Sequence, residues 1–216
     1  HRAGPTGAGL GGADRAEAAG LRRRIEAGEW VVDLRTRTAF AAGHMAGTLN
    51  FGLDGQMSTY LGWLIPWGTP VTLLGETPED VAEAQRELVR IGIDRPAAAA
   101  TGGPERWADG EPLASFGRAA FDELAAVRHH RPVVVLDVRR VQEWEQSHIE
   151  GAVHIPLHEL PQRLDEVPDG EVWVHCQGGY RAAVAASLLA AAGRRVVAID
   201  DEYGARAGLP IVAAAA

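Results

Sequence analysis

One internal repeat limits the fold of this 216-residue chain more than any other feature. The run Val32-Asp33-Leu34-Arg35 returns as Leu136-Asp137-Val138-Arg139. In both copies a histidine follows the aspartate after eleven residues, and a glycine follows it after fourteen. Because residue types, order and spacing all agree, the repeat predicts two similar folding units within one chain.

Each half is predicted to alternate between buried strands and helices. Apolar and β-branched residues predict strands at 30–34, 71–74, 132–138, 172–175 and 195–199. Helices are predicted at 17–27, at 78–91 with Thr77 as the N-cap, at 119–127 and at 181–192. This alternation is typical of parallel α/β sheets. We therefore predict an α/β fold of two units, 14–100 and 113–216, each a central, mainly parallel sheet flanked by helices, joined by a linker at 101–112.

The only cysteine of the chain, Cys176, stands between a predicted strand and a predicted helix. A junction of this kind turns main-chain N–H groups and the positive end of a helix toward one point. These groups stabilise a thiolate, which is the nucleophilic form of cysteine. The position therefore indicates a catalytic nucleophile, with a buried and inert cysteine as the alternative.

The residues that follow Cys176 have the chemistry to bind an anion. The glycines let the main chain approach a ligand closely, and main-chain N–H groups for substrate binding are expected from Gln177, Gly178, Gly179 and Tyr180. Arg181 is expected to be catalytic with Cys176, because a guanidinium can hold an anionic donor through two hydrogen bonds.

Asp137 and Arg139 end the neighbouring predicted strand, and a carboxylate–guanidinium pair there would support the loop after Cys176. The same pair recurs as Asp33 and Arg35 in the first half, which has no cysteine, so a structural role is favoured.

The first half has Gly75 at the position of Cys176 when the predicted strands are aligned. Its loop carries three acidic residues, which would repel an anion: Glu76, Glu79 and Asp80. Residues 14–100 are therefore expected to be catalytically silent.

Composition excludes several other functions. The net charge of −8 argues against binding to nucleic acid or to a membrane surface. A single cysteine rules out an intrachain disulfide and a multi-thiolate metal site, and the histidines lack ligand spacing, so no metal is expected. A reducing, cytoplasmic location fits best.

Together these residues resemble the rhodanese family of sulfurtransferases. The resemblance covers residues 114–212 and is carried by Asp137-Val138-Arg139, Glu143-Trp144, 148–152, Ile155-Pro156, 176–181 and Gly208-Leu209-Pro210. Residues 14–100 resemble a silent rhodanese copy, which gives a tandem arrangement. This arrangement, with 63–67 and 200–203, is similar to the rhodanese portion of fusions to a metallo-β-lactamase-fold persulfide dioxygenase.

The resemblance implies a sulfurtransferase that forms a covalent persulfide on Cys176 and needs no cofactor. A small anionic donor, thiosulfate or a thiol persulfide, would load the cysteine, and a thiol or cyanide would take the outer sulfur. One alternative is a persulfide carrier that serves a partner or fused persulfide dioxygenase with little free turnover. A structural pair of domains is another. Phosphatases with a related loop have one more residue between cysteine and arginine, so the four residues between Cys176 and Arg181 favour sulfur over phosphate.

Overall fold

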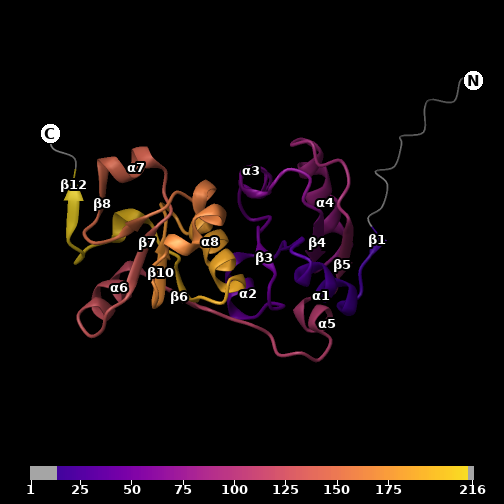
Figure 1. The fold of residues 1–216 in the computed structure, drawn as a ribbon, viewed down its shortest axis with the longest axis horizontal. Helices are drawn as coiled ribbons and strands as arrows, with labels where there is room; N and C mark the ends of the chain where they lie inside the picture. The colour runs from indigo at the N-terminus through magenta and orange to yellow at the C-terminus, as the bar shows by residue number, and fades with distance from the viewer. Residues whose placement is uncertain (1–13, 214–216) are drawn as a thin grey trace, which may run out of the picture.

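The computed structural model describes residues 14–213, which form two parallel five-stranded sheets and a small antiparallel pair of strands (Figure 1). The first sheet has the order β1-β5-β4-β2-β3, and the second has the order β6-β11-β10-β7-β9. If the five strands of each sheet are numbered in the order in which they occur along the chain, both sheets have the spatial order 1-5-4-2-3. All neighbouring strands within both sheets are parallel. The predicted α/β fold, with parallel sheets flanked by helices, is confirmed.

The first sheet and its helices occupy residues 14–108. The strands are β1 (Asp14–Arg15), β2 (Trp30–Asp33), β3 (Leu49–Asn50), β4 (Val71–Gly75) and β5 (Ala98–Thr101). The helices are α1 (Ala18–Glu26), α2 (Arg37–Ala42), α3 (Met57–Leu64), α4 (Pro78–Val89) and α5 (Pro104–Ala108).

The second sheet and its helices follow from residue 117. The strands are β6 (Gly117–Ala119), β7 (Val134–Asp137), β9 (Val153–His154), β10 (Glu171–His175) and β11 (Arg195–Ile199), and the antiparallel pair is β8 (Ser147–Ile149) with β12 (Ile211–Ala213). The helices are α6 (Phe121–Arg128), α7 (Val141–Gln146) and α8 (Tyr180–Ala191), with short 3-10 turns η1 (Leu157–Gln162), η2 (Leu164–Glu166) and η3 (Tyr203–Ala205).

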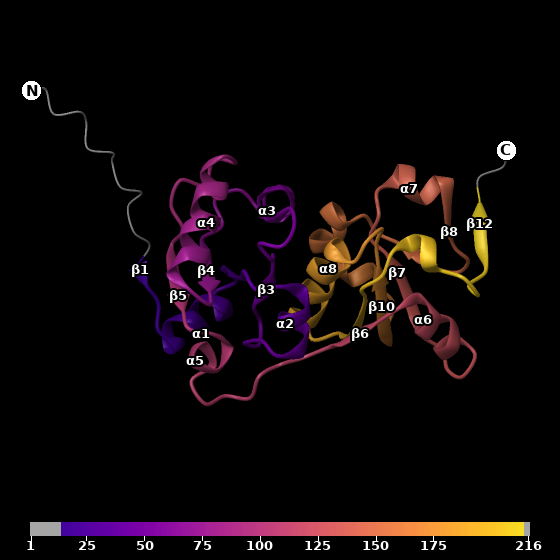
Figure 2. The ribbon, with the colours of Figure 1, turned by 180° about the vertical axis from the view of Figure 1, so that it is seen from behind.

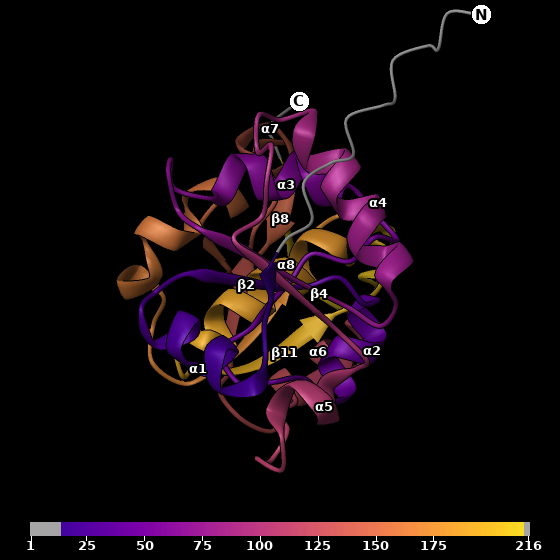
Figure 3. The same cartoon turned by 90° about the vertical axis from the view of Figure 1, so that its right-hand side faces the viewer.

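Alternate strand residues of the first sheet face two different helical layers. Val32 and Leu73 pack with α3 and α4, whereas Val31 and Leu74 pack with α1 and α5. Figure 3 looks onto this half, with α3 and α4 on one side of β2 and β4 and with α1 and α5 on the other. The period-two pattern of the sequence therefore fixes which layer each strand residue meets.

The second sheet is covered by α8 on one face and by α6 on the other. Val174 and Cys176 belong to the cluster on the α8 side, and Val135 and Trp173 to the cluster around α6. Helix α8 lies between the two sheets (Figures 1 and 2) and also packs against β3 of the first one.

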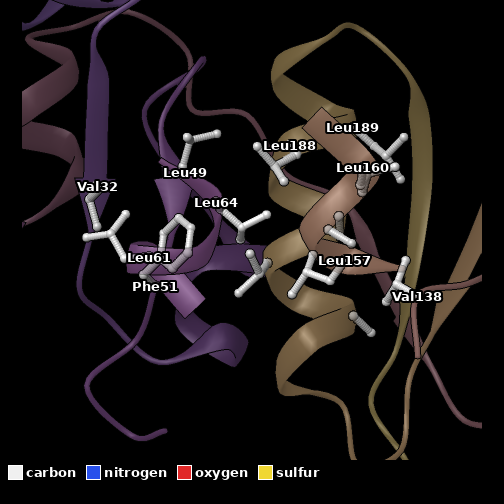
Figure 4. Close-up of a cluster of buried hydrophobic side chains, with 14 of the residues drawn as sticks. Val32, Leu49, Phe51, Leu61, Leu64, Val138, Leu157, Leu160, Leu188 and Leu189 are labelled. Carbon is white, nitrogen blue, oxygen red and sulfur yellow. The ribbon is translucent and has the colours of Figure 1, made fainter. Parts of the chain in front are cut away.

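The two halves share one apolar core across α8. Leucines of α3 face the leucines of α8 and η1 in this cluster (Figure 4). The main-chain N–H of Asn50 in β3 donates to Ser187 Oγ in α8 at 3.0 Å, and both residues are buried. Because apolar side chains from both halves are buried against each other, the halves form a continuous core.

Two sequence-based boundaries differ from the structure. The expected linker at 101–112 contains the end of β5 and helix α5, because Pro104 begins a helix and Trp107 is 1% exposed in the first half's core. The helix expected at 119–127 begins only at Phe121, since Ala119 pairs with Ile199 as part of β6. Residues 214–216, the end of the predicted second unit, lie outside the described residues.

The predicted start of α4 is confirmed in detail. The Thr77 side chain accepts the N–H of Asp80, and the Asp80 carboxylate accepts the N–H of Thr77, with Pro78 at the first helical position. The helix ends at Val89, two residues before the predicted end. Within the described residues, none of the helices has the length and apolar character that crossing a membrane requires.

Candidate active site

Cys176 directly follows β10, the central strand of the second sheet. Its side chain is 2% exposed, and Sγ accepts hydrogen bonds from the main-chain N–H groups of Gly179, at 3.2 Å, and Ala182, at 3.4 Å. These donors are the N-cap and the third residue of α8, where N–H groups have no acceptor within the helix. The loop of residues 176–181, called here the Cys176 loop, therefore gives the sulfur a site for negative charge.

The register of the sheets places Gly75 at the position of Cys176. Asp137 is paired with His175 across β7 and β10, and Asp33 is paired with Leu74 across β2 and β4. Helix α4 begins three residues after Gly75, whereas α8 begins four residues after Cys176. A Cβ on Gly75 would lie 2.9 Å from the Asp80 Cβ, so a cysteine side chain does not fit there without rearrangement.

Arg181 stands in the first turn of α8, at the end of the Cys176 loop, and is already paired. Its guanidinium donates to both carboxylate oxygens of Glu143 on α7, at 2.7 and 2.8 Å. Burial alone would lower the pKa of Arg181, but Glu143 and the nearby Cys176 outweigh it and raise that pKa. The bidentate contact that the sequence predicts for an anionic donor is thus made with Glu143, whose pKa Arg181 lowers.

Asp137 and Arg139 form a buried pair at the end of β7. The Asp137 carboxylate accepts the main-chain N–H of Arg139 at 2.9 Å, Nε at 3.0 Å and Nη2 at 2.6 Å. The guanidinium lies 3.6 Å from the ring centroid of Tyr203, whose main-chain N–H donates to the carbonyl of Gln177 at 2.8 Å. The pair therefore contacts the Cys176 loop through one residue, Tyr203.

The equivalent pair of the first half has nearly the same geometry. Arg35 donates to Asp33 from the main-chain N–H at 2.9 Å, from Nε at 3.1 Å and from Nη2 at 2.6 Å. Since this half has no cysteine, the repeated geometry supports the structural role that the sequence favours for Asp137 and Arg139.

His175 precedes the nucleophile and points to the opposite face of the sheet. Its ring packs between Phe121 and Tyr203 and is fully buried. Within the described residues neither ring nitrogen has a hydrogen-bond partner, and the nearest carboxylate oxygen, Asp137 Oδ2, is 3.6 Å from Nε2. Burial lowers the pKa of His175 to about 4, so the ring is neutral at neutral pH.

Side chains of the first half also reach the Cys176 loop. The Tyr180 hydroxyl donates to the carbonyl of Gly52 at 2.8 Å, and its ring lies 5.6 Å from that of Tyr60 on α3. Arg37, the first residue of α2, donates from Nε to Asp200 Oδ1 at 2.8 Å, just after β11. The loop is therefore enclosed by both halves.

The structure brings together most of the residues that the sequence singles out, but several of them make contacts other than the predicted ones. Gly179 donates its N–H to the sulfur, whereas in the described part of the chain no hydrogen bond reaches Sγ from Gln177, Gly178 or Tyr180. Ala182 donates as well and was missed, although its place six residues after the cysteine, in the first helical turn, could have suggested it.

Two ion pairs at the site, Arg181 with Glu143 and Arg37 with Asp200, could not be predicted from short-range sequence patterns. Glu143 is 38 residues from Arg181, and Arg37 is 163 residues from Asp200. Only the packing of α7 and of the first half on the second sheet brings these charges to the Cys176 loop.

Replacing Gly179 by alanine is expected to slow alkylation of Cys176 by iodoacetamide about tenfold to a hundredfold. Gly179 has φ +90°, and an added Cβ would lie 2.4 Å from Asp200 Oδ1, so the N–H that holds the sulfur must move. A hydrogen bond to a charged group contributes about 1.5–3 kcal/mol. The matched control is Gly193→Ala, at φ +76° with nothing within 4 Å, and equal alkylation rates in the two variants would contradict the expectation.

Among residues 14–213, no group of three or more His, Cys, Asp or Glu side chains is placed to hold a metal ion. A hollow of about 620 Å³ is lined mainly by residues of α1 and of the chain on either side of it, and Cys176 is not part of its lining. The loop geometry, and not cavity size, identifies the site.

The fold and the loop together define a class: a parallel α/β protein with one thiol at the carboxyl end of a central strand, held by main-chain N–H groups. Comparison with known proteins agrees with this class. The family model described as "Rhodanese-like domain" matches residues 120–204. A protein named "Sulfurtransferase" from Allochromatium vinosum is 36% identical over 85 residues, which are 38% of this chain and 79% of that protein.

Two further similarities involve a carrier and a solved structure. The "Putative sulfur carrier protein YrkF" of Bacillus subtilis is 41% identical over 56 residues, 26% of this chain and 30% of that protein. A crystal structure of a rhodanese-like domain protein from Staphylococcus aureus is 28% identical, with a TM-score of 0.41, covering 44% of this chain and 96% of that one.

The chain belongs to the rhodanese-like family, through its second half. It spans less than half the length of several curated proteins that it matches.

Proposed function

We propose that this protein is a sulfurtransferase that moves sulfane sulfur through a persulfide on Cys176. The observation that carries the proposal is the position of Sγ, held by two main-chain N–H groups at the start of α8 with the Arg181 charge beside it. This arrangement stabilises a thiolate and, after reaction, the terminal sulfur of a persulfide. The family membership of residues 120–204 supports it.

The reaction is a double displacement. With thiosulfate as the donor, the Cys176 thiolate attacks the sulfane sulfur, a new S–S bond forms, and sulfite leaves with the electron pair of the broken S–S bond. Cyanide or a thiolate then attacks the outer sulfur and releases the Cys176 thiolate. No electron carrier or metal is required, because each step exchanges one sulfur bond for another. A thiol persulfide would donate in the same way, with its thiolate leaving.

Residues 14–108 serve, in this proposal, as a silent rhodanese-like copy in a tandem arrangement. The shared strand order, the Asp33–Arg35 pair and the lack of room at Gly75 support this role. A fused or partner persulfide dioxygenase is the proposed user of the persulfide.

A persulfide carrier with little free turnover is the second candidate. The similarity to a protein named as a putative sulfur carrier favours it, and the 2% exposure of Cys176 would protect a stored persulfide from solvent. Both candidates require sulfur on Cys176, and they differ in how readily a small acceptor removes it.

Intact-mass measurement tests the proposal. After incubation with thiosulfate the protein is expected to gain the mass of one sulfur atom, cyanide is expected to remove it, and Cys176→Ser is expected to gain none. A gain that cyanide removes only over hours would favour the carrier. No gain from thiosulfate or from glutathione persulfide would refute sulfur transfer at this loop.

A further inference from the structure

Two cations from different halves of the chain lie close to the Cys176 loop. Arg181 comes from α8 of the second half, and Arg37 comes from α2 of the first. Arg181 stands in the first turn of α8, five residues after Cys176, and Arg37 Nε would lie 3.4 Å from a Cβ on Gly179, the residue whose N–H donates to Sγ. Arg181 is already paired with Glu143, whereas Arg37 on α2 of the first half has different partners.

Arg37 is held in place by carboxylates of both halves. Its Nε donates to Asp200 Oδ1 at 2.8 Å, and its Nη1 lies 3.3 Å from Asp54 Oδ2. The other oxygen of Asp200 accepts from Arg118 Nη2 at 2.7 Å and from its Nε at 3.2 Å. Hydrogen bonds from Arg37 and Arg118 offset the burial of Asp200 and lower its pKa, so Asp200 is ionised and bridges the two halves.

This ion pair lies directly against the residue that holds the sulfur. A Cβ on Gly179 would be 2.4 Å from Asp200 Oδ1 and 3.4 Å from Arg37 Nε, and the N–H of Gly179 donates to Sγ at 3.2 Å. Asp200 therefore lies against the turn of the loop, and its negative charge opposes a thiolate nearby. Arg37 and Arg118, both hydrogen-bonded to Asp200, supply positive charge that offsets this opposition, and Arg37 is the one of the two that comes from the first half.

We propose that Arg37 is a positioning residue of the Cys176 site: it fixes Asp200 against Gly179 and neutralises it, so that the half without a cysteine becomes part of the reactive site. The inference deepens the proposed function and rests on it, because positioning matters only if Cys176 reacts. It also assigns a role to Asp200, one of the two acidic residues that stand before Glu202 and Tyr203.

Several titratable groups lie on the elements packed around Arg37 and the Cys176 loop. They are Arg181 on α8, Glu143 on α7, Asp200 after β11, Glu202 beside Gly178, Arg118 on β6, Asp54 before α3, and the buried Asp137, Arg139 and His175. Variants that change one charge at a time separate the contribution of Arg37 from the others.

The pH profile of Cys176 alkylation by iodoacetamide tests the proposal, since Cys176 is the only thiol of the chain. Arg37→Gln is expected to move the midpoint of the profile upward by about 1 pH unit, a size that fits one partly exposed charge near the sulfur. Arg37→Lys is expected to recover at least half of the shift. Asp200→Asn is expected to move the midpoint downward, and the double variant Arg37→Gln/Asp200→Asn is expected to return it close to that of the unaltered protein.

Arg24→Gln is the matched control. Arg24 lies in the same half, its side chain is 27% exposed compared with 29% for Arg37, and it also pairs with a carboxylate, that of Glu29. A midpoint for Arg37→Gln equal to that of Arg24→Gln would overturn the proposal. If Arg37→Gln fails to fold, the Asp200→Asn variant provides the test. An alkylation midpoint of Asp200→Asn that is not lower than that of the unaltered protein would also overturn the proposal. Alkylation needs no sulfur donor, so failure of the unaltered protein to gain sulfur refutes the proposed function separately.

Discussion

Replacing Arg139 by leucine is expected to lower the free energy of unfolding by about 3–5 kcal/mol, the cost of leaving one partner of a buried ion pair alone. Asp137 is fully buried and Arg139 is 2% exposed. Three N–H groups of Arg139 satisfy the Asp137 carboxylate. Burial by itself would lower the pKa of Arg139, but the hydrogen bonds and charge of Asp137 outweigh it and raise that pKa, so Arg139 keeps its charge. Denaturant unfolding measures the loss.

Three further variants make this expectation specific. Arg35→Leu removes the same contacts in the first half and is expected to cost a similar amount. Asp137→Leu combined with Arg139→Leu is expected to be more stable than Arg139→Leu alone, because no unpaired charge is left in the core. Arg163→Leu removes exposed pairs with Glu159 and Glu166 and is expected to leave the unfolding midpoint unchanged. If the free energy of unfolding of Arg139→Leu equals that of Arg163→Leu, the buried pair does not have the stabilising role expected here.

Lowering the pH from 6.5 to 4 is expected to cost about 3 kcal/mol of stability through His175 alone. Burial lowers the pKa of this ring to about 4, from 6.5 in the unfolded chain. Between these values the unfolded state binds a proton that the folded state does not, so protons favour unfolding and stability falls as the pH falls. Above pH 6.5 both states hold a neutral ring, and the contribution does not change with pH.

His175→Leu isolates this effect, because the first half has Leu74 at the equivalent position of its central strand. The variant removes two ring nitrogens that have no hydrogen-bond partner in the described residues. Its unfolding free energy is expected to fall less steeply than that of the unaltered protein between pH 6.5 and 4. His44, whose pKa burial also lowers, is present in both proteins and cancels in the difference. Parallel stability curves for the two proteins would show that His175 does not carry the acid sensitivity.

The sequence determined the features that depend on neighbours in the chain. The spacing after Asp33 and Asp137 predicted equivalent strand ends, and the sheet register places Gly75 and Cys176 at equivalent positions. The cap formed by Thr77 and Asp80 was predictable because its atoms are three residues apart. The N–H of Gly179 was predictable as a donor because a tight loop before a helix turns such groups inward.

Only the tertiary structure decided which charges surround the sulfur and how the halves meet. Arg37 and Asp200 are 163 residues apart, and no short-range pattern records that contact. The shared core likewise depends on the packing of α8 against β3 and of η1 against α3, which brings leucines of both halves together (Figure 4). Local signals act through backbone geometry over a few residues, so they fix strands, caps and the loop. The charges around Cys176 belong to side chains that meet only after both halves have packed together. The electrostatic environment of the sulfur is therefore set by the tertiary structure and not by the local sequence.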